Sequence, residues 1–484
     1  MRQPRLCLSL LVAILPAALA QAPTPAPATV PVLMLSDLHF DPYRNITEAR
    51  LKQLTVDPPE KWDDILSRPL SAAEQKDAAA VALKRTGCDS TKLDTDYNLL
   101  TSSLIAEQAA MPDPLFITVS GDLITHNFDC KYNSLVKNHT AAGLSDFAAK
   151  TGTFMAIKLH AAYPKAPIYL TLGNNDSGCT DYFETEATPK QKNPYLDQLA
   201  QAFAAVALDA GNAKRILATV PTRGDYSVML PQPFADTKLI VLQDMFESAS
   251  YHGSCPGGSS AGAAANQIAW LKAQLADTSV KHFWIMAHIA PGVDPYGTIV
   301  SNRSKQSPGC PGSATLKGND LAGTLRDSTS DIELALYGHT HMDEMRLITD
   351  NAGQGKVAGR LNPSISTWNG NYPAFTVASV DPAKALLVDF TVYHSVDKTG
   401  AAGDWSSNKY TYSDAYGQPD YSAASLTALT GIFKTDPTGT AAGNYKQYYE
   451  SGATSNWSAY VCAIVSDTPD QYNTCNVCGT GTTR

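Results

Sequence analysis

Short apolar runs recur along this chain, and each is followed at once by polar or glycine-containing residues. Runs of this length, bounded by turn residues, are typical of buried β-strands. Between several of them, apolar residues recur at three- and four-residue spacing, which predicts amphipathic helices. We expect strands at residues 30–35, 115–119, 168–172, 239–242, 282–287 and 332–337, and helices at 97–110, 144–162, 193–210 and 263–275. Strands that alternate with helices indicate an α/β layered domain.

The later part of the chain departs from this alternation. Runs at 375–380 and 385–393 follow one another without a helical stretch and predict antiparallel strands. The segment 45–93 reads as an inserted helical cap. From about residue 400 the composition shifts to Gly, Ser, Thr, Tyr and Asp, with short helices expected at 423–433, 445–451 and 457–465. We therefore expect a main α/β domain at 30–400 and a helical, cysteine-containing subdomain at 401–484.

The start of the chain has the pattern of an export signal. Arg2 and Arg5 precede an apolar run, and the small residues at 18–20 fit a cleavage site. The apolar run is short for a membrane span, and Pro16 interrupts it. We predict a signal peptide at 1–20, a Pro/Ala-rich linker at 21–29, and a protein secreted to the extracellular space or the periplasm. No later segment predicts stable membrane insertion.

Eight cysteines follow the predicted signal, and an even number in an exported chain indicates disulfides. Zinc binding is the alternative for Cys475 and Cys478, which are separated by two residues, but no second matching pair exists. Their connectivity cannot be read from the sequence. Pairing of Cys462 with Cys475 or with Cys478 would close a short terminal loop.

The formal net charge of -9 describes an acidic protein. Such a protein has no general attraction for nucleic acid or anionic membranes. We expect no nucleic-acid partner, and any affinity for phosphate must be local. The sequence does not predict the oligomeric state.

Residues of the metal-binding type stand directly after the predicted strands. These residues are Asp37 and His39 after the first run, Asp122 after the second, Asn174 after the third, His288 after 282–287, and His339 and His341 after 332–337. Ligands bind outside the carboxyl ends of strands in open α/β sheets, so five loops can converge on one crevice. Each fragment alone is equally consistent with hydrogen-bonded core residues. Five fragments in sequence, each at a strand end, favour a metal site.

The spacing within the fragments supports this interpretation. Residues two apart in extended backbone face the same way, so Asp37 and His39 can bind one ion together. Glycine precedes Asp122, Asn174 and His339, which permits sharp turns and close backbone approach. Carboxylate, imidazole and amide ligands without thiolate suit Zn, with Mn or Fe as alternatives. Two ions about 3.5–4 Å apart need a shared oxygen ligand, and the carboxylate of Asp122 is the simplest choice.

The ordered set DLH, GD, GN, H and GHTH resembles the calcineurin-like metallophosphoesterase superfamily. More narrowly, the chain resembles the acid sphingomyelinase-like phosphodiesterases and the related endopolyphosphatases over residues 30–392. Supporting stretches are SDLHFDP at 36–42, GDLITH at 121–126, HIAPG at 288–292 and NPSISTWNGNYPAFTV at 362–377. The resemblance implies a metallophosphoesterase-type β-sandwich flanked by helices, with a helical cap insertion and a small C-terminal helical appendage.

The resemblance also implies how two divalent metal ions are shared. One ion would take Asp37, His39, Asp122 and His341, and the other Asp122, Asn174, His288 and His339. A bridging hydroxide would attack phosphorus in line. The sequence departs from the sphingomyelinase pattern at Asn175, where that family usually has a histidine, a candidate proton donor to the leaving oxygen.

Loss of that histidine leaves His126 as the candidate general acid, because it matches another family histidine near the leaving group. The alternative is a loop histidine that faces solvent or bonds to the core. Asp176 could orient a ligand or be purely structural. Asp122 and His126 are thus the expected catalytic residues. The other histidines of the mature chain match no ligand motif and are expected to be structural or at the surface; they are His139, His160, His252, His282 and His394.

These features predict a secreted enzyme that hydrolyses a phosphodiester. The substrate would be a phosphate ester, either a small molecule, a lipid headgroup or polyphosphate. The alternatives are an endopolyphosphatase or a nucleotide phosphohydrolase. A non-catalytic metal-binding extracellular protein is the alternative of another class, although the complete ligand set argues against it.

Overall fold

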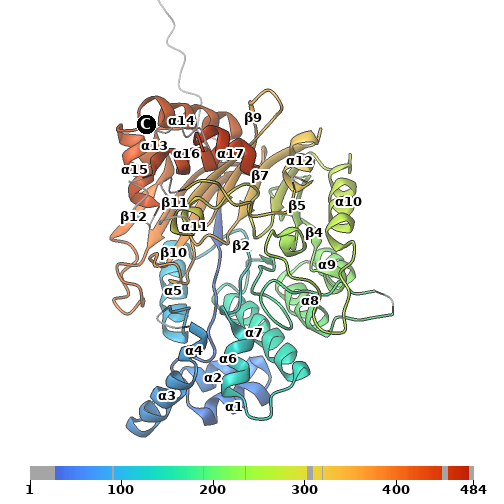
Figure 1. The fold of residues 1–484 in the computed structure, drawn as a ribbon, viewed down its shortest axis with the longest axis vertical. Coiled ribbons are helices and arrows are strands. Elements are labelled where there is room, and N and C mark those ends of the chain that lie inside the picture. The colour runs from blue at the N-terminus through green and yellow to red at the C-terminus, as the bar shows by residue number, and fades with distance from the viewer. Residues whose placement is uncertain are drawn as a thin grey trace, which may run out of the picture.

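Two six-stranded sheets face one another in the computed structural model (Figure 1), which describes residues 28–478 except 90–91, 189, 235, 302–308, 319 and 450–455. The order in the first sheet is β12 (Asn408–Thr411), β11 (Leu386–His394), β10 (Ala374–Asp381), β1 (Val30–Leu35), β2 (Ile117–Val119) and β3 (Ile168–Leu170). The order in the second is β4 (Tyr226–Met229), β5 (Thr237–Val241), β6 (His282–Met286), β7 (Asp331–Tyr337), β9 (Gly355–Leu361) and β8 (Glu344–Thr349). The predicted α/β class with a helix-flanked sandwich is confirmed.

Each sheet combines parallel and antiparallel strands. In the first sheet, β1 pairs in parallel with β2, and β2 with β3, while β10 runs antiparallel to β1. In the second, β5, β6 and β7 are parallel to one another. The carboxyl ends of β1, β2 and β3 therefore lie at one edge of the first sheet, and those of β6 and β7 at one edge of the second.

Aromatic side chains fill the space between the two sheets. Trp284 of β6 is fully buried and meets Phe116 edge to face, with ring centres 5.9 Å apart. Its indole nitrogen donates to the carbonyl of Ala385 at 2.7 Å. Because a buried indole N–H needs an acceptor, this bond ties the second sheet to the hairpin that joins β10 and β11.

Helices cover the sheets and extend the fold. Those between β1 and β10 are α1 (Glu48–Val56), α2 (Trp62–Leu66), α3 (Ala72–Lys84), α4 (Thr86–Asp89), α5 (Tyr97–Ala110), α6 (Phe128–Leu135), α7 (Ala141–Ala162), α8 (Pro194–Val206), α9 (Ala210–Arg223), α10 (Ala263–Leu275), α11 (Pro295–Ser301) and α12 (Asp320–Asp327), with 3-10 turns η1 (Pro59–Lys61) and η2 (Asp244–Glu247). The C-terminal helices are α13 (Tyr412–Tyr416), α14 (Ala423–Thr435), α15 (Thr440–Tyr448), α16 (Trp457–Val465) and α17 (Pro469–Cys475). Helices α1 to α4 fall within the predicted cap segment, and α14 and α16 pack against β8 and β9 (Figure 1).

One predicted helix is wrong only in its last turn. The expected helix at 193–210 ends at Val206, and α9 begins at Ala210. Leu208 has a φ of 58°, a left-handed conformation that interrupts the helix. Asp209 then caps α9 by accepting a hydrogen bond from the backbone N–H of Asn212.

All eight cysteines that follow the predicted signal are paired. The disulfides are Cys88–Cys130, Cys179–Cys255, Cys310–Cys478 and Cys462–Cys475. The predicted disulfides are confirmed, and the alternative of a zinc site at Cys475 and Cys478 is wrong because each is bonded to a different cysteine. None of the helices described has the length and apolar character to span a bilayer. The predicted signal and most of the linker lie outside the described residues, and the division into domains stays a prediction.

Candidate active site

The two sheets bring all seven predicted ligand residues to one cluster. Asp37 and His39 follow β1, Asp122 follows β2 and Asn174 follows β3, all from the first sheet. The other three residues follow strands of the second sheet, His288 after β6 and the pair His339 and His341 after β7. The expectation of converging loops is met, although the loops come from two facing sheets rather than from one open sheet.

Five of the seven residues adopt a backbone conformation that non-glycine residues rarely take. The φ angles are 49° for Asp37, 41° for His39, 53° for Asp122, 75° for His339 and 67° for His341. Each such residue costs about 1–3 kcal/mol, and clusters of them occur where the surrounding structure holds a functional geometry. The strain thus marks this cluster as a functional site.

Glycines allow the loops to approach closely, as predicted. A Cβ atom on Gly173 would collide with the carboxylate of Asp122, and one on Gly338 would collide with Ser36 and Asp37. Any larger residue at these positions would push the ligand-bearing loops apart.

One half of the cluster consists of Asp37, His39 and His341. The Nε2 atoms of His39 and His341 face each other at 3.1 Å. Oδ1 of Asp37 lies 3.8 Å from the first and 3.6 Å from the second. Donor atoms this close together can bind one ion, since ligand atoms bonded to the same ion are about this far apart.

The other half consists of Asn174, His288 and His339. Oδ1 of Asn174 lies 3.2 Å from Nε2 of His288 and 2.8 Å from Nδ1 of His339. These three atoms form a second set of converging donors.

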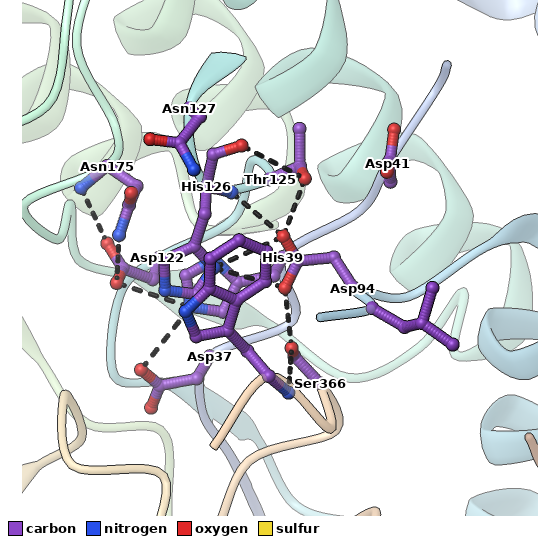
Figure 2. Close-up of polar contacts among 12 residues, drawn as sticks. Asp37, His39, Asp41, Asp94, Asp122, Thr125, His126, Asn127, Asn175 and Ser366 are labelled. Carbon is purple, nitrogen blue, oxygen red and sulfur yellow. Dashed lines mark hydrogen bonds and ion pairs between the residues drawn. The ribbon is translucent and has the colours of Figure 1, made fainter. Parts of the chain in front are cut away.

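Asp122 lies between the two halves. Its Oδ2 atom is 3.3 Å from Nε2 of His39 and 3.1 Å from Nε2 of His288. Figure 2 shows this carboxylate between Asn175 and His39. Asn175 holds it in place, because its backbone N–H donates to Oδ1 and its side-chain amide to Oδ2, each at 2.8 Å. A single oxygen placed between nitrogens of both halves is the geometry that a bridging ligand requires.

Two of the histidines are oriented by backbone carbonyls. Nδ1 of His39 lies 3.0 Å from the carbonyl oxygen of Ile124, and Nδ1 of His288 lies 2.7 Å from that of Ser120. A carbonyl can only accept, so in both rings Nδ1 carries the proton and donates it. In the neutral form of each ring the lone pair of Nε2 then points into the cluster, which is the arrangement of a metal-binding histidine.

The charges in the cluster favour a bound cation. Burial opposes ionisation of Asp122, but the positive charges of His288 and His39 outweigh it and hold the pKa of Asp122 well below its usual range. Burial lowers the pKa of His39, yet the nearby carboxylates of Asp122, Asp37 and Asp94 together exceed this effect and raise that pKa to about 9. Among the residues described, only histidines form ion pairs with Asp37 and Asp122. Two buried carboxylates without Lys or Arg need positive charge, which the protonated rings of His39 and His288 supply and which divalent cations bound in their protons' place would supply as well.

The donor set therefore fits metal ions. Asp37, His39 and Asp122 each offer a ligand atom, and these atoms lie within 4.8 Å of one another. Carboxylate, imidazole and amide donors suit Zn, Mn or Fe. Six of the seven residues are buried, and His339 is half-buried. The side of the cluster that faces solvent therefore lies at His339.

Known proteins resemble this chain over most of its length, although no family model matches it. Human "acid sphingomyelinase-like phosphodiesterase 3b" is 25% identical over 406 residues, which cover 79% of this chain and 80% of that protein. Mouse "cyclic GMP-AMP phosphodiesterase SMPDL3A" is 23% identical over a region that covers 93% of this chain and 92% of that protein. "Sphingomyelin phosphodiesterase 1" of Caenorhabditis elegans is 25% identical and covers 81% of this chain and 62% of its own.

This chain is similar in sequence to the acid sphingomyelinase-like phosphodiesterases. The resemblance predicted from the motifs is thereby confirmed, and so is the predicted enzyme class, a phosphoric ester hydrolase.

The ring of His126 lies against the metal-type cluster, next to His39 and His341. Its ring is stacked between His39, at 4.0 Å between ring centres, and Trp368, at 4.2 Å. Nδ1 of His126 lies 3.1 Å from both carboxylate oxygens of Asp94. The ring is thus fixed in plane and rotation, with Nε2 on the side away from Asp94.

Asp94 and Trp368 were missed by the reasoning from sequence. Asp94 lies just after the segment read as a cap, on no predicted strand or helix, and its spacing to His126 carries no motif. Trp368 lies within the family-like stretch 362–377, which was the only signal that could have found it. The structure stacks Trp368 on the ring of His126 and places Asp94 beside Nδ1 of the same ring (Figure 2).

Asn175, the departure from the sphingomyelinase pattern, does not take the place of a proton donor in this structure. Its side-chain amide is directed at Asp122, and its Oδ1 is buried. An amide has no dissociable proton at ordinary pH, so it can orient the carboxylate but cannot act as an acid.

Asp176 orients the loops. Its carboxylate accepts hydrogen bonds from the backbone N–H groups of Gly173, Leu123 and Ile124. Burial and the charge of Asp122 raise the pKa of Asp176 to about 7, against these three bonds. Since the bonds join the loops that carry Asp122 and Asn174, Asp176 holds the two loops together.

The histidines that matched no ligand motif lie outside the seven-residue cluster. His139 and His252 are exposed, while His160 and His282 are half-buried and His394 is buried. His282 lies beside Asp331 and Glu333 at the amino ends of β6 and β7, whereas the seven-residue cluster follows the carboxyl ends.

Proposed function

We propose that this protein hydrolyses a phosphodiester with the help of two divalent metal ions held by the seven-residue cluster. The observation that carries the proposal is the position of Asp122, whose Oδ2 lies 3.3 Å from His39 and 3.1 Å from His288. Beside the shared Asp122, one ion would be bound by Asp37, His39 and His341. The other ion would be bound by Asn174, His288 and His339. Zn is the expected metal, with Mn or Fe as alternatives.

Two bound cations would supply an activated water and would neutralise charge on the phosphoryl oxygens. The residues of the chain would do the rest. Asp122 would hold the two halves at a fixed separation, and Asn175 would keep its carboxylate from rotating. A diester phosphate placed at the solvent side of the cluster would then meet the attacking water in line.

In its doubly protonated form, His126 would give its Nε2 proton to the leaving oxygen and keep the Nδ1 proton that is bonded to Asp94. Asp94 supports this role because it fixes Nδ1 of His126 and leaves Nε2 on the opposite side of the ring. A poor alkoxide leaving group needs such a proton, whereas a nitrophenolate leaves without one. The sequence alternative of a histidine merely facing solvent fits less well, because both faces of the ring are covered.

A phosphodiester is preferred over polyphosphate as the substrate. The reported relatives are named phosphodiesterases, and the formal net charge of -9 disfavours a long polyanion. Asn175 in place of the family histidine keeps an endopolyphosphatase or a nucleotide phosphohydrolase as the second candidate. We also propose that the protein is secreted, since four disulfides suit an oxidising compartment.

Hydrolysis of bis-p-nitrophenyl phosphate, with and without a chelator, tests the proposal. We expect turnover that chelation abolishes and that added Zn or Mn restores. Protein that is verified to contain two metal ions and shows no turnover between pH 4 and 8 would overturn it. That result would favour the non-catalytic metal-binding protein.

A further inference from the structure

Lys131 on α6 is a lysine with no exposed surface. It lies beside Asp94, the residue that holds the candidate proton donor His126. Its Nζ atom donates to Oγ1 of Thr125 at 2.6 Å and to Oδ2 of Asp41 at 3.2 Å. Asp89 and Asp94 lie 3.3 and 3.8 Å from the same nitrogen. An ammonium group is buried only where it is paired, so three carboxylates and a hydroxyl hold this one in a fixed place.

A chain of hydrogen bonds leads from Lys131 to His126. Lysine can only donate, so the oxygen of Thr125 must accept from Nζ. The single hydroxyl proton of Thr125 is then free to go to Oδ2 of Asp94, at 2.6 Å. Asp94 in turn holds Nδ1 of His126. Lys131 therefore sets the direction of the Thr125 hydroxyl, which donates to the carboxylate of Asp94 (Figure 2).

Lys131 also lies near the other support of the His126 ring. Its Nζ is 6.0 Å from the ring centre of Trp368, which is stacked on His126 at 4.2 Å with an angle of 6° between the planes. A cation at this distance is attracted to the face of an indole ring. One ammonium group thus bonds to the hydroxyl that supports Asp94 and lies within cation–π range of the aromatic ring that covers His126.

The cap holds Lys131 in this position. Arg85, at the end of α3, pairs with Asp41 at 2.7 Å and lies 3.7 Å from Asp89 of α4. The Cys88–Cys130 disulfide joins the residue before Asp89 to the residue before Lys131. The cross-link therefore joins the cap helix α4 covalently to α6, directly beside the buried ion pairs.

We propose that Lys131 is a positioning residue for His126, and that the Cys88–Cys130 cross-link keeps it in register through the cap. The effect on rate rests on the proposed function, whereas the effect on the ring position does not. The cap would then help to fix the position of the His126 ring, in addition to covering the fold.

Thr125→Val interrupts the hydrogen bonds between Lys131 and Asp94 at their middle member. Valine has nearly the same shape as threonine and lacks the hydroxyl. Two phosphodiesters with the same phosphocholine group, p-nitrophenyl phosphorylcholine and glycerophosphocholine, differ in the leaving group. We expect kcat for glycerophosphocholine to fall about 10- to 100-fold, the range for loss of a residue that orients a functional histidine, with KM unchanged. The nitrophenyl ester should lose no more than about threefold. Equal losses on both esters would overturn the proposal.

The disulfide is tested by the double variant Cys88→Ser/Cys130→Ser, with Cys462→Ser/Cys475→Ser as the matched control. Both remove one cross-link, but the control disulfide joins α16 and α17 of the C-terminal helices. The first variant should lose glycerophosphocholine hydrolysis selectively, and the control should not. Selective loss in the control, or in neither, would contradict the role of the cross-link.

A measurement without turnover separates this proposal from the proposed function. The imidazole N–H of His126 that is bonded to Asp94 should give a downfield proton resonance in the full-length protein, assigned by its loss in His126→Ala. We expect it to weaken or disappear in Thr125→Val and in Cys88→Ser/Cys130→Ser. An unchanged resonance in both variants would overturn the positioning role, whatever the activity of the protein.

Discussion

The carboxylate of Asp94 faces the ring of His126, with Nδ1 lying 3.1 Å from each of its two oxygens. Asp94 is itself held by Ser366 at 2.7 Å and by Thr125 at 2.6 Å, and none of its side chain is exposed. This carboxylate is fully buried, and both of its oxygens lie at hydrogen-bond distance from one ring nitrogen. The arrangement indicates that the orientation of the His126 ring matters.

Replacing His126 by alanine should therefore slow esters according to their leaving groups. Loss of general-acid catalysis costs about 100- to 10,000-fold, and this cost applies where the leaving oxygen needs a proton. We expect such a loss in kcat/KM for glycerophosphocholine and a much smaller one for p-nitrophenyl phosphorylcholine. His139→Ala, at an exposed histidine, is the control. Equal losses on both esters would remove His126 from the role of proton donor.

Asp94→Asn should show the same selectivity in a weaker form. The amide keeps the shape of the side chain but loses the charge and one acceptor, so it can hold the wrong tautomer of His126. We expect kcat for the alkoxide ester to fall about 10- to 100-fold. Asp404→Asn, which removes a carboxylate that accepts from Ser406 and Ser407, serves as the control. A loss of the same size on the nitrophenyl ester would indicate a general structural role.

Asn175→Ala should weaken metal binding. The amide of Asn175 donates to Oδ2 of Asp122 at 2.8 Å, the oxygen that we propose bridges the two ions. Removing a residue that orients a metal ligand typically costs 10- to 100-fold in metal affinity, so a loss of about this size is expected. Competition with a fluorescent chelator measures it. The control, Asn444→Ala, removes an amide that donates to the carbonyl of Ala415 in the C-terminal helices. Metal affinity equal to that of the parent protein would contradict the prediction.

Glu107 on α5 makes the stability of the fold depend on pH. Burial raises the pKa of its carboxyl from 4.5 to about 8, against a hydrogen bond from Ser103. The folded protein thus keeps a proton that the unfolded chain releases above pH 4.5. The stability linked to this group is complete below that pH and is lost as the pH rises toward 8, by roughly 5 kcal/mol at most.

Glu107→Gln removes this dependence because glutamine stays neutral. The difference in free energy of unfolding between the variant and the parent protein should grow in favour of the variant from pH 5 to pH 8. Urea unfolding at several pH values measures it, with Glu60→Gln at an exposed residue as the control. A difference that stays constant across this range would contradict the raised pKa of Glu107.

The metal-type cluster could be predicted from sequence because each ligand directly follows an apolar run. Asp37 after β1 and His288 after β6 are examples in which the strand end alone fixes the place of the side chain. The division of these strands between two sheets did not follow from local pattern, since a buried strand looks alike in either sheet. It depends on contacts such as that between Trp284 and Ala385, which lie 101 residues apart.

The surroundings of His126 could not be predicted for the same reason. Asp94 and Trp368 contact the ring from two different loops, and Lys131 lies behind Asp94 on a helix. A buried lysine or aspartate has the same letter in the sequence as an exposed one, and only the fold shows its partners. The break between α8 and α9 was missed because it depends on the left-handed backbone of Leu208, a residue with no preference for that conformation.

The metal content of three variants tests the central claim most directly. Metal analysis of the purified protein should give two ions per chain. His341→Ala and His288→Ala should each retain one, because they lie in opposite halves of the cluster. Asp122→Asn should lose both or bind both far more weakly, because its oxygen serves the two halves together. A parent protein with two ions whose number is unchanged by Asp122→Asn and His288→Ala would contradict the account.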